Sequence, residues 1–306
     1  MAEPVAIFAG QGAQFVGMGK DLAAADTDID ALYTRANAVL DVDLRQLCFE
    51  GPAEALTRSN VCQPAIFVTS VACWSAFSKR LPAIAFTATA GLSLGEWTAL
   101  HMAGVLDFET TVRVLEARGR FMQEACDSTP GGMVSVMGLT REQLAEVCAQ
   151  SGAHVANINS DQQIVLSGGK DAVAAADKLA AALGARTVLL NVAGAFHSPL
   201  MAPARERLAA YLKDIPFATP RLPVLANVTG QPHAADGEAI KAAMLRQVTE
   251  SVRWVDCVRA AGVGPFVEFG PGKVLSGLIR RIDKQLVTAN VQDAATLDAA
   301  VAALGA

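Results

Sequence analysis

Charged side chains are scarce in this chain of 306 residues. They make up 18% of it against 52% hydrophobic residues, and the 25 basic residues do not outnumber the 30 acidic ones. A composition this apolar can bury a large core, which excludes intrinsic disorder. The net charge of −5 argues against nucleic-acid binding through bulk positive charge. At about 100–200 residues per domain, the length allows two domains, or one large domain with an insertion.

The sequence also lacks the patterns of membrane and secreted proteins. Its two longest apolar stretches, 61–77 and 81–94, are interrupted, so neither offers about 20 consecutive apolar residues for a membrane span. Met1–Pro4 has no basic region before an apolar stretch, unlike a signal peptide. The six cysteines include no CxxC, which argues against a zinc site or disulfide framework and for reduced thiols. We expect no metal, no membrane contact and a cytoplasmic location; a mature organellar protein without its transit peptide fits the same pattern.

Strand and helix patterns alternate along the chain, which is typical of an α/β fold. After a break at 129–132, the order β-α-β-β-α-β is the signature of a ferredoxin-like unit. We predict a discontinuous α/β-hydrolase-like catalytic domain with a mostly parallel sheet over residues 1–130 and 195–306. The ferredoxin-like subdomain, residues 131–194, is inserted into it. Strands of the large domain are expected at 5–9, 84–90, 223–226 and 265–269.

The sharpest signal for chemistry is the segment 91–95, Gly-Leu-Ser-Leu-Gly, which matches G-x-S-x-G. A buried strand is predicted before it and a helix after it, the context that a nucleophile elbow requires. Small flanking residues allow neighbouring chain to pass closely, and the helix N-terminus stabilises negative charge near the serine oxygen. We interpret Ser93 as a catalytic nucleophile. The alternative is a serine that caps a packed helix.

One arginine lies on the apolar face of the helix predicted over 108–125. Arg118 falls among apolar residues such as Val114 and Met122. An inward arginine needs an anion, because an unpaired buried charge is costly. Its partner is either a structural Asp or Glu, or a substrate carboxylate that the planar guanidinium binds through both oxygens. The other charged or polar residues gather on the opposite face: Glu109, Arg113, Glu116, Arg120, Gln123 and Glu124.

Four histidines compete for the role of general base. His101 lies in the helix that follows Ser93, and His154 precedes a strand of the inserted unit. His233 falls in a turn, where we expect it to be solvated. His197 lies where the chain re-enters the large domain, in Ser-then-His order. His197 is therefore the favoured base, with His101 as the structural competitor.

Taken together, these residues resemble the malonyl-CoA:acyl-carrier-protein transacylase family, the acyltransferases of fatty-acid and polyketide synthesis. The likeness covers nearly the whole chain in the expected order. The matching segments are 8–14 (family F-P-G-Q-G-S-Q), 91–96 (G-H-S-L-G-E), 118–123 (R-G-x-x-M-Q), 157–168 (N-x-N-S-x-x-Q-x-V-x-S-G), 194–198 (the histidine motif) and 267–275 (V-E-x-G-P-G-x-V-L).

The resemblance implies a Ser–His dyad without an Asp. Ser93 would be the nucleophile and His197 its base, oriented by a backbone carbonyl near Gln247. The backbone N–H groups of Gln11 and Leu94 would form the oxyanion hole.

The same resemblance implies how the substrate is chosen. Arg118 would hold the free carboxylate of a malonyl group. Phe196 favours malonyl over methylmalonyl, because a bulky ring leaves less room for an α-methyl branch. Two positions depart from the family pattern. Leu92 replaces a histidine that contacts the acyl pocket, which bears on selectivity and hydrolysis, and Ala9 replaces a proline, which presets the Gln11 donor less rigidly.

The activity implied is a two-step transfer of malonyl from malonyl-CoA to Ser93 and then to the phosphopantetheine thiol of acyl-carrier protein, with no metal or redox cofactor. Carrier proteins are typically acidic, so a basic docking patch is expected; the alternative is a solvated helix face. The rival functions are an acyl hydrolase or thioesterase of the same fold, and a non-catalytic synthase scaffold. Candidates for the patch are Lys273, Arg280, Arg281 and Lys284, with Arg120 as a further member.

Overall fold

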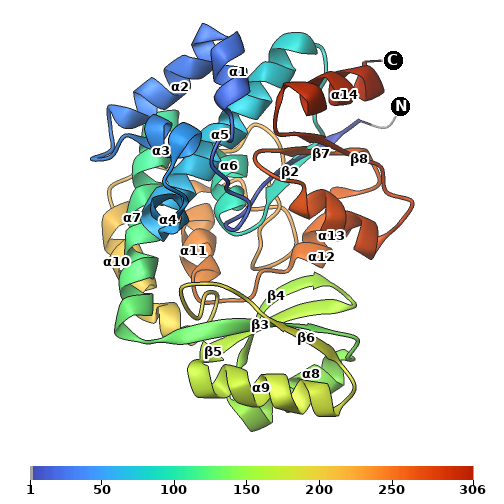
Figure 1. Cartoon of the computed structure of the whole chain (residues 1–306). Helices are drawn as coiled ribbons and strands as arrows, with labels where there is room; N and C mark the ends of the chain where they lie inside the picture. The colour runs from blue at the N-terminus through green and yellow to red at the C-terminus, as the bar shows by residue number, and fades with distance from the viewer. Residues whose placement is uncertain (1–2, 306) are drawn as a thin grey trace.

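The computed structural model describes residues 3–305, which form two units built on separate sheets (Figure 1). The larger unit holds a parallel sheet in the order β2-β1-β7-β8, so the predicted parallel sheet is confirmed. An isolated parallel bridge between Thr89 and Val224 extends it beyond β2. Its strands are β1 (Val5–Phe8), β2 (Ala88–Gly91), β7 (Phe266–Phe269) and β8 (Thr288–Val291).

Helices cover both faces of this sheet, and its central strand β1 is accordingly apolar throughout. Successive residues of β1 point to opposite faces. Ala6 and Phe8 join the core on one side, whereas Val5 and Ile7 join the core on the other. The helices of this unit are α1 (Lys20–Ala25), α2 (Thr27–Asn37), α3 (Leu44–Glu50), α4 (Ala53–Thr57), α5 (Ser59–Arg80), α6 (Leu94–Met102), α7 (Phe108–Ser128), the short 3-10 helix η1 (Pro199–Met201), α10 (Ala202–Leu212), α11 (Gly237–Gln247), α12 (Trp254–Ala261), α13 (Val274–Ile282) and α14 (Ala294–Leu304).

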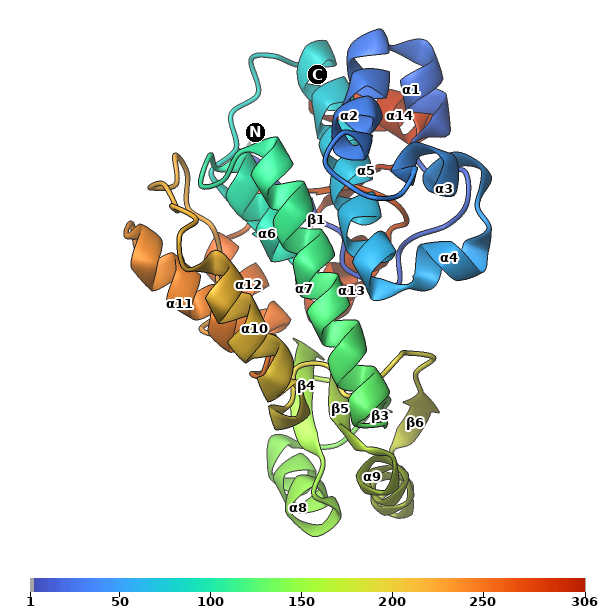
Figure 2. The ribbon, with the colours of Figure 1, turned by 90° about the vertical axis from the view of Figure 1, so that its left-hand side faces the viewer.

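Helix α5 is the central core helix of the larger unit. By length and composition alone it could cross a membrane, but 83% of its most apolar stretch is buried inside the protein. Helix α7 packs alongside it (Figure 2). At their crossing, a Cβ on Gly119 would lie 2.2 Å from the carbonyl oxygen of Ser59. Glycine at this position therefore lets α7 come close enough to place Arg118 against α5.

The smaller unit carries the predicted ferredoxin-like order, and this part of the fold prediction is confirmed. Its antiparallel strands lie in the order β4-β5-β3-β6. Both of its helices cover the sheet face turned away from the larger unit (Figures 1 and 2). Its elements are β3 (Gly131–Met137), α8 (Arg141–Ser151), β4 (His154–Ser160), β5 (Gln163–Gly169), α9 (Lys170–Ala182) and β6 (Arg186–Leu189).

The domain limits predicted at 130/131 and 194/195 stay a prediction. The small sheet begins at Gly131 and ends at Leu189, and residues 190–194 lead back to the larger unit. Positions 1, 2 and 306 of the predicted domain limits lie outside the described residues.

Two predicted strands differ from the structure. The stretch 84–90 was expected to be a strand, but β2 begins only at Ala88. Ile84 and Phe86 pack onto the core from a loop, so their hydrophobicity reflects burial and not sheet pairing. The stretch 223–226 contributes only isolated bridges, a parallel one from Val224 to Thr89 and an antiparallel one from Leu225 to Pro232. Its first residue is Pro223, which has no N–H to donate to a ladder.

The close crossing at Gly119 gives a stability prediction. Alanine normally improves a helix interior by about 1 kcal/mol over glycine. At Gly119 the added methyl would meet the Ser59 carbonyl, so we expect Gly119→Ala to lower unfolding stability by about 1–3 kcal/mol. Gly277, in α13, has no atom within 4 Å of an added Cβ, and Gly277→Ala is the matched control that should stabilise. Chemical denaturation of both variants measures the difference; stabilisation of both would contradict the close crossing.

Candidate active site

Ser93 sits in a strained turn between β2 and α6. Its backbone angles are φ 55° and ψ −104°. In residues 3–305, Ser93 and His197 are the non-glycine residues with positive φ. Such conformations cost about 1–3 kcal/mol each and persist only where the surroundings enforce them. Both residues that sequence reasoning singled out for catalysis are therefore held in strained backbone conformations.

The two glycines of the elbow are required by backbone contacts. A Cβ on Gly91 would lie 2.0 Å from the carbonyl carbon of Gly95. A Cβ on Gly95 would lie 2.2 Å from the carbonyl oxygen of Phe8, at the end of β1. The G-x-S-x-G pattern thus allows α6 to begin directly against the central strand, with Ser93 at the apex of the turn.

Asn227, which was not predicted from the sequence, stabilises the turn at Ser93 by hydrogen bonds to its backbone. The N–H of Ser93 donates to Asn227 Oδ1 at 2.8 Å, and Asn227 Nδ2 donates to the carbonyl oxygen of Gly91 at 2.8 Å. Asn227 is fully buried. Its position directly after the apolar stretch 223–226 could have identified it. In open α/β sheets, the functional site lies at the carboxyl ends of the parallel strands, so polar residues there are candidates.

His197 meets Ser93 across the elbow. His197 Nε2 lies 2.9 Å from Ser93 Oγ, and Nδ1 lies 2.7 Å from the backbone carbonyl oxygen of Gln247. A carbonyl only accepts hydrogen bonds, so Nδ1 carries the proton and Nε2 is free to accept the serine proton. Burial, together with the positive charge of Arg118, lowers the pKa of His197 to about 4. The ring is therefore neutral at neutral pH, as a general base must be.

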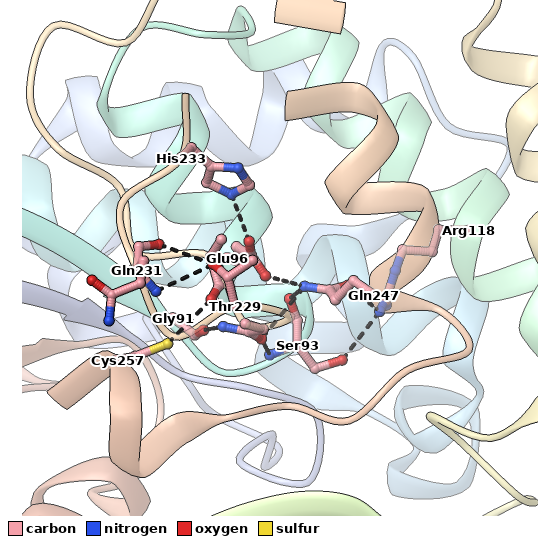
Figure 3. Close-up of polar contacts among 11 residues, drawn as sticks. Gly91, Ser93, Glu96, Arg118, Thr229, Gln231, His233, Gln247 and Cys257 are labelled. Carbon is pink, nitrogen blue, oxygen red and sulfur yellow. Dashed lines mark hydrogen bonds and ion pairs between the residues drawn. The ribbon is translucent and has the colours of Figure 1, made fainter. Parts of the chain in front are cut away.

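Arg118 is 1% exposed and reaches the nucleophile from α7 (Figure 3). Its Nη1 donates to Gln63 Oε1 at 2.7 Å, and its Nη2 donates to Gln247 Oε1 at 3.0 Å and to Ser93 Oγ at 3.1 Å. Within residues 3–305 Arg118 forms no ion pair with a carboxylate, so the structural Asp or Glu considered as its partner is not found there. Burial lowers its pKa to about 10, which leaves it charged at neutral pH.

Gln11 and Leu94, expected to supply the oxyanion hole, lie near the nucleophile, Gln11 in the loop after β1 and Leu94 at the start of α6, immediately after Ser93. Neither backbone N–H has an acceptor within the described part of the chain. The Leu94 N–H also lies at the positive end of the α6 dipole. Two unpaired donors at these positions are what stabilisation of a developing oxyanion needs.

A cavity of about 510 Å³ opens over Ser93 and His197, between the larger unit and the small sheet. Leu92 and Phe196 lie in its wall beside the two residues, and the far wall comes from β3, β4 and β5. Its mixed lining of apolar and amide side chains suits a long, partly polar ligand. The small sheet supplies Met133, Asn157, Asn159 and Val165 to the wall, and the segment that leads back to the larger unit supplies Leu190, Asn191, Val192 and Ala193.

The remaining histidines lie elsewhere, and one prediction was wrong. His101 Nδ1 lies 2.9 Å from the carbonyl oxygen of Leu106, away from the nucleophile, and His154 is exposed on β4. His233, expected to be solvated, instead has a side chain only 2% exposed that pairs with Glu96. The neighbouring glycine and proline predicted a turn of the backbone, but they did not indicate that the imidazole of His233 points inward.

The basic residues predicted as a docking patch divide into two groups. Lys273, Arg280, Arg281 and Lys284 are exposed on or next to α13, and none forms an ion pair within residues 3–305. Arg120 lies on α7 and pairs with Glu116. Among the same residues, no three His, Cys, Asp or Glu side chains are grouped so as to hold a metal ion.

Comparison with known proteins assigns this geometry to a family. Residues 5–298 match the acyl transferase domain family. A malonyl CoA-acyl carrier protein transacylase of Salmonella typhimurium is 39% identical, covering 96% of this chain and 97% of the relative. The crystal structure of such a transacylase from Clostridium perfringens superposes with a TM-score of 0.94 at 35% identity, covering 99% and 98%. A malonyl-transacylase in complex with its type II PKS acyl-carrier protein gives 0.93 at 38% identity, covering 99% and 100%.

The depressed pKa of His197 predicts how Ser93 reactivity depends on pH. A fluorophosphonate, which labels activated serines, should react at nearly its neutral-pH rate down to about pH 5, because His197 gains its proton only near pH 4. Intact-mass kinetics of labelling measure this. Ser93→Ala should abolish labelling, and His197→Ala should slow it by about 100-fold or more at neutral pH, where the imidazole of the wild type is neutral. An acid limb centred near the ordinary histidine pKa of 6.5 would show that burial does not control the base.

Proposed function

This chain belongs to the acyl transferase domain family, and from that premise we propose that it transfers malonyl from malonyl-CoA to the phosphopantetheine thiol of an acyl-carrier protein in fatty-acid or polyketide synthesis. The observation that carries this proposal is the buried guanidinium of Arg118, which touches Ser93 Oγ and, among residues 3–305, has only neutral hydrogen-bond partners. A cation beside the nucleophile without a carboxylate of its own favours an acyl group that brings one.

In the first half-reaction, Ser93 Oγ attacks the thioester carbonyl as His197 Nε2 takes the serine proton. The negative charge that develops on the carbonyl oxygen is stabilised by the N–H groups of Gln11 and Leu94. Collapse of the tetrahedral intermediate breaks the C–S bond, and the CoA thiolate takes the proton from His197. The product is a malonyl ester on Ser93 and free CoA thiol.

In the second half-reaction, the phosphopantetheine thiol gives its proton to His197 and attacks the ester carbonyl. The same two N–H donors stabilise the second oxyanion. Its collapse breaks the bond between the carbonyl carbon and Ser93 Oγ, and the serine oxygen recovers a proton from His197. The Gln247 carbonyl holds the ring in the required tautomer throughout, a role given to Asp in triads.

Selection of the acyl group is proposed to rest on three residues. Arg118 would bind the free carboxylate of malonyl, displacing part of its present amide contacts. Phe196, 7% exposed beside His197, narrows the space for an α-methyl branch. Leu92 lines the acyl pocket with a side chain that offers no hydrogen bond, so it shapes the pocket by size alone.

The scheme uses only side-chain and backbone groups, and we propose that the enzyme works without a metal or redox cofactor. We also propose a cytoplasmic location. All six cysteines are free and five of them are buried, which supports a reducing compartment.

We propose that the carrier protein docks on the four basic residues around α13. Arg281 Nη1 donates to Gln163 Oε1 at 2.6 Å, so the patch adjoins β5, whose Val165 lines the cavity. Lys273, at the N-terminus of α13, extends the same surface. Positive charge that is not already paired is available to an acidic partner. Arg120 is left out of this surface because Glu116 already neutralises it.

Malonyl-CoA alone, without carrier, should leave a malonyl ester on Ser93 that intact-mass spectrometry detects. Arg118→Ala should reduce acylation by malonyl-CoA about 100-fold or more, the scale of removing one partner of a buried charge pair. Acetyl-CoA brings no carboxylate, so its acylation rate should persist or rise, which also serves as the folding control. Absence of the ester on the wild-type protein would refute the scheme, and passage of the ester mainly to water when carrier is present would favour the hydrolase.

Reversal of two patch charges tests the docking surface. Arg280→Glu with Arg281→Glu should raise the KM for the carrier by about tenfold, because attraction to an acidic partner becomes repulsion. Acylation by malonyl-CoA should be unchanged. The matched control is Arg205→Glu with Lys213→Glu, an equal charge change at exposed positions around α10 that form no ion pair in the described part of the chain. Equal loss in both half-reactions, or an equal KM effect in the control, would contradict this docking site.

A further inference from the structure

Behind the dyad lies a buried carboxylate that the transfer scheme does not use. Glu96, in the first turn of α6, is 1% exposed. His233 Nε2 lies 2.7 Å from its Oε1, and Gln247 Nε2 lies 2.5 Å from its Oε2 (Figure 3). A carboxylate only accepts hydrogen bonds when ionised, so both partners donate to it. A buried carboxylate persists only with such partners, and here each oxygen has one.

Through Gln247, this carboxylate is connected to the nucleophile, the base and the guanidinium. The Gln247 amide oxygen accepts from Arg118 Nη2 at 3.0 Å, and its backbone carbonyl meets His197 Nδ1 at 2.7 Å. Its amide nitrogen also donates to the backbone oxygen of Ser93 at 2.9 Å. One glutamine therefore contacts the nucleophile, the base and the guanidinium. Its side-chain amide must face one way for the contacts with Ser93 and Arg118 to form, whereas the backbone contact with His197 does not depend on the amide.

Glu96 is the charged group among the acceptors that orient this amide, and its contact with the amide nitrogen is the shortest, at 2.5 Å. In the observed orientation the NH2 group points toward three acceptors, namely Glu96 Oε2, the Ser93 carbonyl oxygen and Asn227 Oδ1. A flipped amide would place oxygen against these acceptors and NH2 against the Arg118 guanidinium. Removing the charge of Glu96 weakens the preference between the two orientations, because a neutral side chain can donate as well as accept.

Glu96 also provides negative charge for Arg118 without occupying its guanidinium. One amide side chain separates the carboxylate from the arginine. Burial lowers the pKa of Arg118, and the negative charge of Glu96 raises it in part again. A direct ion pair would do this more strongly, but it would fill the position that a substrate carboxylate needs.

We propose that the buried Glu96–His233 pair is a positioning device for anionic acyl groups: it fixes the Gln247 amide so that Arg118 stays charged, oriented and open to the acyl carboxylate. His233 acts by holding the second carboxylate oxygen, with its own backbone N–H anchored on the Val224 carbonyl oxygen at 2.8 Å. The inference rests on the proposed malonyl transfer. It predicts that damage to the pair affects charged acyl groups more than neutral ones.

The test compares acylation of Ser93 by malonyl-CoA and by acetyl-CoA, each as kcat/KM. Glu96→Gln keeps the side-chain shape and removes the charge. It should lower the malonyl rate by about 10- to 100-fold and the acetyl rate by less than about 3-fold, within the usual range of coupling between contacting residues. His233→Leu should shift the ratio in the same direction. His233→Gln retains an N–H donor for Glu96 and should recover much of the loss.

The control is His101→Gln, because His101 is a half-buried histidine on α6 itself that hydrogen-bonds only to a backbone carbonyl away from the site. Its malonyl-to-acetyl ratio should equal that of the wild type. Equal loss of both rates in Glu96→Gln, or an unchanged ratio, would mean that the pair only supports the fold and would overturn the inference. If Glu96→Gln does not fold, the malonyl-to-acetyl ratios of His233→Leu and His233→Gln are compared instead. Equal ratios in these two variants would overturn the inference. A wild type that forms no malonyl ester would instead overturn the proposed function.

Discussion

The site depends on a buried positive charge that the protein solvates with amides and not with carboxylates. Arg118 is held by Gln63 from α5 and Gln247 from α11, and it meets Ser93 at the elbow. Neutral dipoles offset only part of the cost of burying a guanidinium. The remaining electrostatic free energy is available to a ligand that brings its own negative charge. Packing in the larger unit, including the close approach of α5 and α7 at Gly119, brings α5, α11 and the Ser93 elbow together around Arg118.

The same charge acts on the base. Arg118 contributes to the low pKa of His197, together with burial. An anion bound at the guanidinium would cancel part of this effect, since opposite charges offset each other at the imidazole. The base would then hold a proton more readily when the acyl carboxylate is in place than when the cavity holds only water. In the proposed scheme, recognition of the acyl group and activation of the serine would therefore be coupled through one electrostatic interaction.

The features that could be predicted from the sequence are those set by residues close together in the chain. The elbow at Ser93 and the inward Arg118 follow from patterns within one turn or one helix, and the parallel and ferredoxin-like sheets follow from element order. Asn227, Gln63 and the Glu96–His233 pair were missed because their partners lie 55 or more residues away along the chain. Gln63 interrupts an apolar helix, which was a usable signal. His233 gave a misleading one, since proline and glycine neighbours describe a turn but not the direction of its side chain.

The position of the small unit in the chain has a consequence for how activity arises during folding. Ser93 and His197 are separated by 104 residues, and the whole ferredoxin-like unit lies between them. The Gln247 carbonyl that orients the imidazole comes a further 50 residues later. Contacts this distant in sequence form late, because the intervening chain must be ordered before they add stability. A nascent or partly folded chain thus lacks the Ser93–His197 contact, and reactivity of Ser93 would report that distant segments of the larger unit have come together.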